Sequence, residues 1–131
     1  QWQEEMVHAM KIFNFIAQRG GRAELGAIKQ PPKTWKSTLD VFETAYKHEQ
    51  YITKKINDLV DLAKKHNDHA TESFLSWYVD EQVEEEATAD EMVQKVKMTK
   101  SMPGGLYMLN KEAAARPLIS AKIGGMTQPE D

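Results

Sequence analysis

The chain has 131 residues, of which 40% are hydrophobic and 28% are charged, as is ordinary for one globular domain with a modest core. Its formal net charge of −3 gives no indication of nucleic-acid binding. The absence of cysteine excludes disulfides, thiolate metal sites and cysteine nucleophiles, and it fits a reducing compartment such as the cytoplasm. The chain has no run of about 18 apolar residues and no secretory signal pattern, so no membrane partner is expected.

The first predicted helix runs from about Trp2 to Arg19 and stops at Gly20-Gly21, a pair typical of a helix C-cap. The helical pattern of apolar residues is already present at Met6, and no Ser, Thr, Asp or Asn that could act as an N-cap precedes it. The chain also opens on Gln1 instead of an initiator methionine. We therefore expect a fragment, or a chain whose beginning is missing, that enters in mid-helix.

A long connection from Gly20 to Lys36 leads to the second predicted helix, which starts near Ser37 and continues to about Lys65. Ser37 and Asp40 resemble a capping box in which Asp replaces Glu. The sequence His66-Asn67-Asp68 then predicts a tight turn.

The third predicted helix runs from about Asp68 to Lys100, and Pro103-Gly104-Gly105 breaks the chain after it. A short amphipathic helix is expected from Leu106 to Ala115, followed by a loosely ordered tail from Arg116 to Asp131. The sequence thus predicts an all-α protein with one helical domain over residues 1–115 and a flexible tail over residues 116–131.

Each long predicted helix carries a glutamate within its apolar stripe, namely Glu5, Glu49 and Glu85. An unpaired buried carboxylate costs many kcal/mol, so such a group neutralises, pairs with a cation or binds a metal. Basic residues are scarce on these three faces. Several acids that converge in a bundle core therefore indicate bound cations.

The spacing of these glutamates predicts that they lie at one height. Glu49 lies 18 residues before Asn67 and Glu85 lies 18 residues after it, so in a helical hairpin both stand roughly 27 Å from the turn. Glu5 lies 15 residues before Gly20, a comparable distance from its own helix end. The connection of 17 residues reaches about 55 Å when extended, enough to cross a bundle and bring all three into one layer.

Further potential ligands surround this layer. Glu5-x-x-His8 places a carboxylate and an imidazole one turn apart on one face, where they can chelate one metal or hold two neighbouring ones. Oxygen ligands with one imidazole favour iron or manganese over copper, and the lack of thiolates argues against structural zinc. The third helix presents more oxygen ligands over about 160° of arc, and these are Glu81, Gln82, Glu84 and Glu85. Glu86 points away from them and is interpreted as solvated.

Two alternatives remain open. In a non-catalytic helical interaction protein these acids are surface charges, the Glu-x-x-His pair is solvated, and Glu49 is a core carboxylate capped by Tyr46. Another di-iron bundle enzyme, such as a peroxide-reducing one, has two Glu-x-x-His pairs, whereas this chain shows one. Neither alternative explains the matched heights of Glu49 and Glu85 as well.

The chain resembles bacterial non-haem ferritin over about residues 1–113. The stretches that carry the resemblance are Gln3–His8, Tyr46–Gln50, Trp77–Glu86, Gly104–Tyr107 and Asn110–Glu112. The resemblance implies a ferritin-like four-helix bundle with one long crossover and a short C-terminal fifth helix. It also implies a homo-oligomeric cage of two dozen chains that oxidises Fe(II) with O2 or peroxide and stores ferric mineral.

The same resemblance assigns roles to individual residues. Glu5 and His8 would belong to the ferroxidase centre, with Glu5 bridging two irons, while Glu49 and Glu85 would hold the second iron. The residues that resemble the third iron site of the bacterial proteins are Glu4, Glu81 and Glu84, with Glu85 shared. Gln82 matches the glutamine beside the centre.

Two departures from the family pattern matter. The family's opening helix, which supplies a terminal glutamate ligand and a quarter of the core, has no counterpart in the sequence, so we expect an exposed apolar face and incomplete or lost activity from this chain alone. The third helix reads Gln82-x-x-Glu85 instead of a second Glu-x-x-His, which disfavours bacterioferritin. Met6 stands where bacterioferritins carry a haem ligand, but haem-free relatives have similar methionines, so no haem is expected.

Overall fold

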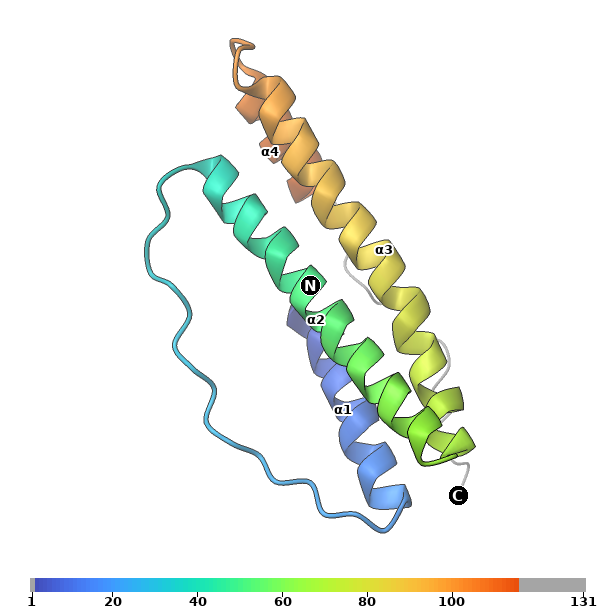
Figure 1. The fold of residues 1–131 in the computed structure, drawn as a ribbon. Coiled ribbons are helices and arrows are strands. Elements are labelled where there is room, and N and C mark those ends of the chain that lie inside the picture. Colours follow the sequence, from blue (N-terminus) through green and yellow to red (C-terminus); the bar gives the residue numbers. More distant parts are fainter. Residues whose placement is uncertain (1, 116–131) are drawn as a thin grey trace, which may run out of the picture. The chain divides into compact units, whose positions relative to one another are not determined.

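The computed structural model describes residues 2–115, and the predicted tail, 116–131, lies outside them. The described residues form four helices and no strand, which confirms the all-α prediction (Figure 1). The helices are α1 (Trp2–Gln18), α2 (Thr38–Lys65), α3 (His69–Thr99) and α4 (Gly105–Ala114). None of them combines the length and the apolar character needed to cross a bilayer.

The described chain forms two compact units, residues 2–31 and residues 32–114. The first unit contains α1, which ends in a Schellman motif. Gly20 adopts a left-handed φ of 74°, its N–H donates to Ala17 O at 3.0 Å, and the N–H of Gly21 donates to Ile16 O at 2.9 Å. The predicted glycine C-cap is therefore confirmed, and α1 ends one residue before the predicted Arg19.

The second unit begins with the N-cap of α2. Ser37 is extended and its hydroxyl accepts a hydrogen bond from Asp40 N at 3.2 Å. The Asp40 carboxylate in turn accepts from Lys36 N at 3.0 Å, one residue earlier than in a standard capping box. The shorter side chain of Asp thus still satisfies a second backbone donor at this helix start.

The helices α2 and α3 form an antiparallel hairpin that turns at His66-Asn67-Asp68 (Figure 1). Asn67 takes the left-handed position with a φ of 53°, and the N–H of Asp68 donates to Ala63 O at 2.9 Å. Asp68 also caps α3, because its carboxylate accepts from Thr71 N at 3.1 Å. Consecutive residues thus end one helix and begin the next, as the sequence predicted.

The core of this second unit lies between α2 and α3 and continues to α4. Its buried residues are Glu49, Ile56 and Ala63 on α2, Leu75, Tyr78, Gln82, Val93 and Val96 on α3, and Gly105 and Leu109 on α4. Ion pairs support this packing at the surface, where Lys95 of α3 pairs with Glu112 of α4 and Lys97 lies 3.4 Å from Glu43 of α2. Glu49 and Gln82 are thus polar residues embedded in an otherwise apolar core.

Candidate metal centre

The first unit contributes the carboxylate and imidazole of the Glu-x-x-His motif. His8 Nδ1 lies 3.9 Å from Glu5 Oε2, so the i, i+3 spacing brings the two side chains to one face of α1 as predicted. The His8 side chain is 16% exposed and that of Glu5 is 54% exposed. Glu4 precedes them and is half-buried. The motif is therefore formed locally and accessible to an incoming cation.

The second unit contributes a buried glutamate and a buried glutamine that meet across the hairpin. Glu49 shares its buried stripe on α2 with Ile56 and Ala63, which follow at intervals of seven residues. Gln82 Nε2 donates to Glu49 O at 3.3 Å and to Thr53 Oγ1 at 3.2 Å. These hydrogen bonds fix the register of α3 on α2 and place Gln82 level with Glu49.

The remaining carboxylates of α3 flank this buried amide. Glu81 and Glu85 are half-buried and Glu84 is exposed. Gln82 is buried in the structure, whereas Glu85 is only half-buried. The prediction that Glu85 lies in the middle of the apolar stripe of this helix is therefore wrong. Glu85 lies at the edge of the stripe, about one turn beyond Gln82, where it stays accessible.

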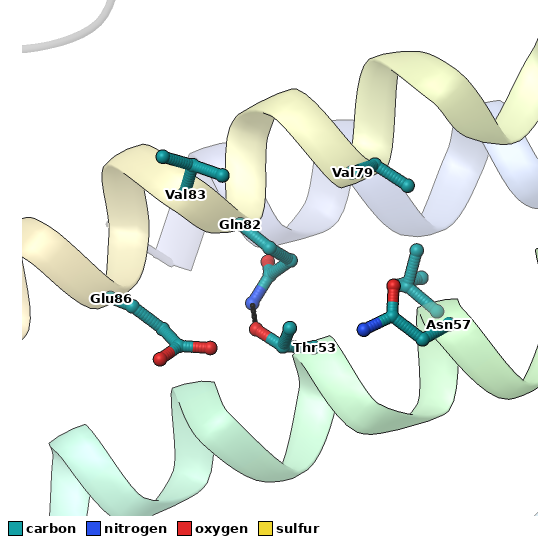
Figure 2. A pocket seen from close by; sticks show the side chains of 7 residues that line it. Thr53, Asn57, Val79, Gln82, Val83 and Glu86 are labelled. Carbon is teal, nitrogen blue, oxygen red and sulfur yellow. Dashed lines mark hydrogen bonds between the residues drawn. The ribbon is translucent and has the colours of Figure 1, made fainter.

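A groove of about 340 Å³ runs between α2 and α3 on one flank of this site (Figure 2). It is lined by Thr53, Ile56 and Asn57 of α2 and by Val79, Gln82, Val83 and Glu86 of α3. Glu86 is half-buried here, which corrects its interpretation as a fully solvated residue. Sequence analysis missed Thr53 and Asn57, because neither residue type in mid-helix signals a site.

An aromatic cluster lies one turn before Gln82 on α3. The ring of Tyr78 stacks at a tilt on Phe74, with 5.5 Å between centroids, and meets Trp77 edge-on at 4.8 Å. Burial raises the pKa of Tyr78 to about 12, so its phenol stays neutral at physiological pH. The cluster lies on α3 between Gln82 and the hairpin turn.

The predicted ligands are divided between the two units. Glu4, Glu5 and His8 belong to the first, and Glu49, Glu81, Gln82, Glu84 and Glu85 belong to the second. Within residues 2–115, no three His, Asp or Glu side chains are gathered into a group that would hold a metal ion. The convergence of the two sets therefore stays a prediction, although carboxylates, an imidazole and an amide are the donors that iron accepts.

Comparison with known proteins identifies similar sequences. A family model for the ferritin-like domain matches residues 1–99. The chain is 44% identical to a bacterial non-heme ferritin of Campylobacter jejuni over 108 residues, which cover 82% of the chain and 65% of that relative. It is 40% identical to a bacterial non-heme ferritin of Bacteroides fragilis over 116 residues, 88% of the chain and 72% of the relative. The chain thus spans slightly less than two thirds of the Campylobacter protein.

Solved structures show the same relationship. An open pore ferritin from the hyperthermophilic archaeon Archaeoglobus fulgidus superposes with a TM-score of 0.87 at 48% sequence identity. The match covers 89% of this chain and 72% of the archaeal one. Sequence and structure therefore point to one fold.

Proposed function

The chain belongs to the family of ferritin-like domains, and on that premise we propose that it is an iron-storage protein with ferroxidase activity. It oxidises Fe(II) to Fe(III) with O2 or peroxide at a di-iron centre, and the product is deposited as ferric mineral inside a cage of identical subunits. The names of its bacterial relatives, non-heme ferritins, support this assignment.

The observation that carries the proposal is the buried Glu49 carboxylate, held level with the Gln82 amide. Burying a carboxylate in an apolar core is costly, so its retention there favours a role as a cation ligand. In the proposed centre Glu5 would bridge two irons, His8 would be a further ligand of the centre, and Glu49 and Glu85 would hold the second iron. Half-buried Glu85 lies where an ion can still reach it.

The chemistry follows from this donor set. Anionic oxygen ligands stabilise Fe(III) more than Fe(II) and so favour loss of an electron from each bound ion. Two neighbouring Fe(II) ions supply the two electrons that, with two protons, reduce O2 to hydrogen peroxide. Gln82 is a neutral donor and binds Fe(III) less strongly than a carboxylate, so the oxidised product leaves instead of remaining as a resident cofactor.

Three further carboxylates provide the path by which the product leaves. Glu4, Glu81 and Glu84 form the proposed third iron site, which shares Glu85 with the centre. Glu84 is exposed and Glu81 is half-buried, so α3 presents a gradient from buried to solvated ligands. We infer that this path delivers the product to the mineral stored by a cytoplasmic homo-oligomer.

The test adds Fe(II) aerobically and follows ferric absorbance in the wild type and in the Glu49→Gln and Glu43→Gln variants. We expect a fast phase of about two irons per chain, as a site that holds two metal ions requires. Glu49→Gln should abolish this phase, because an amide replaces the anionic ligand. Glu43→Gln is the control, since Glu43 lies on α2 but pairs with Lys97 at the surface. Equal rates in all three proteins would favour the non-catalytic alternative.

A further inference from the structure

The orientation of the Gln82 amide is fixed by a group that can only accept hydrogen bonds. Gln82 Nε2 lies 3.3 Å from the backbone oxygen of Glu49. A carbonyl oxygen has no proton to donate, so the end of the amide that faces it must be the NH2 group. The identity of the two ends of this side chain is therefore determined by its surroundings.

Thr53 provides the second acceptor for the same NH2 group. Its hydroxyl oxygen lies 3.2 Å from Gln82 Nε2, and Figure 2 shows the amide nitrogen directed at it. Glu49 and Thr53 are one turn apart on α2, so both N–H bonds of Gln82 are directed at this helix. The amide oxygen Oε1 consequently faces away from Thr53.

The groove borders this second contact. Gln82 lines the groove together with Asn57 and Glu86, but Gln82 itself is only 7% exposed. The bond to Glu49 O is long for a neutral hydrogen bond, and alone it restrains the amide only weakly. The Thr53 hydroxyl adds a second restraint on the same nitrogen.

We propose that Thr53 is a positioning residue, which holds Gln82 so that its amide oxygen, and not its nitrogen, is presented to iron at the centre. This inference rests on the proposed function. An amide oxygen has lone pairs that can ligate a hard cation or accept from water bound to it, whereas the amide nitrogen offers only N–H donors. A flipped Gln82 would direct two partial positive charges at the metal.

The test uses Co(II), a redox-stable probe whose visible absorption reports its ligands, with the 131-residue chain. Thr53→Val removes the hydroxyl and keeps the branched shape, while Thr53→Ser keeps the hydroxyl. Because one neutral hydrogen bond restrains the amide, we expect Thr53→Val to weaken Co(II) binding about three- to tenfold and to shift its absorption band. Thr53→Ser should bind within about twofold of the wild type.

A second background separates positioning from general destabilisation. In a Gln82→Leu variant the amide is gone, so adding Thr53→Val should leave Co(II) affinity unchanged. Identical affinity and spectra in wild type and Thr53→Val, or an equal loss in both backgrounds, would overturn the positioning role. Failure of the wild type to bind Co(II) more tightly than Glu49→Gln would instead contradict the proposed function itself.

Discussion

At the scale of single residues, Tyr78 shows how burial changes the response to pH. Burial raises its pKa from 10.0 to about 12. Between these two values the folded chain keeps the phenolic proton and the unfolded chain loses it, so stability is complete below pH 10 and falls as pH rises toward 12. We expect Tyr78→Phe to show a shallower loss of stability over this range than the wild type.

The measurement is chemical denaturation at several pH values between 9 and about 12. Tyr51→Phe is the matched control, because it removes the same hydroxyl from a tyrosine that is 54% exposed. Other groups titrate in this range, so only the difference between each variant and the wild type is informative. Parallel pH profiles for Tyr78→Phe and the wild type would show that the phenol does not contribute.

The pairing and burial of side chains could be predicted where they depend on one helix, but not where they depend on how two helices pack. The Glu5–His8 pair follows directly from i, i+3 spacing, and the structure shows it. Two other features depend on where the axis of α2 lies against α3. Gln82 is more deeply buried than Glu85, and Glu86 lines a groove. A helical wheel gives angles about one axis, so it cannot locate that neighbour.

At the scale of elements, the α2–α3 turn concentrates its stabilising contacts in two residues, Asn67 and Asp68. We expect Asp68→Ala to lower the free energy of unfolding by about 1 kcal/mol, because Thr71 N loses its capping carboxylate. Urea denaturation of the second unit's helices by circular dichroism measures this. Asp58→Ala is the control, since its exposed pair with Lys54 contributes only a few tenths of a kcal/mol. Similar losses in both variants would contradict a special role for the cap.

Helix boundaries could be predicted because their signals are local. Three helix ends have a residue suited to them: the side chain of Ser37 accepts a backbone hydrogen bond, and Gly20 and Asn67 adopt the left-handed conformation. All three residues lie at the predicted helix ends. The structure ends α3 at Thr99, one residue before the predicted Lys100, and ends α4 at Ala114, one before Ala115. Such one-residue differences are usual, since terminal turns fray.

At the scale of the whole molecule, the proposed centre requires ligands from different helices to come together, and no single helix determines this. Glu5 and His8 lie on one compact unit, and Glu49 and Gln82 lie on the other. The hairpin alone sets the height of Glu49 against α3, as the hydrogen bond from Gln82 shows. The sequence argument for the place of the first helix, α1, rests on the length of the connection from Gly20 to Lys36, which limits how far α1 can lie but does not orient it.

Self-association and metal chemistry should be separable, because α4 packs near the C-terminal end of α3, whereas Gln82 and Glu85 lie near its middle. Leu106 and Met108 of α4 are 49% and 72% exposed, whereas Leu109 is buried and attaches α4 to α3. Lys95, which pairs with Glu112 of α4, follows Gln82 by 13 residues, or about 20 Å along the helix. An exposed apolar surface on a short helix favours contact with another copy.

We therefore expect a Leu106→Ser, Met108→Ser double variant to lose self-association while keeping wild-type Co(II) affinity. Sedimentation velocity measures the first property and visible absorption the second. Lys111→Ser is the control, since it changes an exposed charged residue of the same helix and leaves the apolar surface intact. Unchanged association in the double variant would show that α4 does not mediate assembly. A parallel loss of Co(II) binding would show that the metal centre requires neighbouring subunits, because α4 carries none of the proposed ligands.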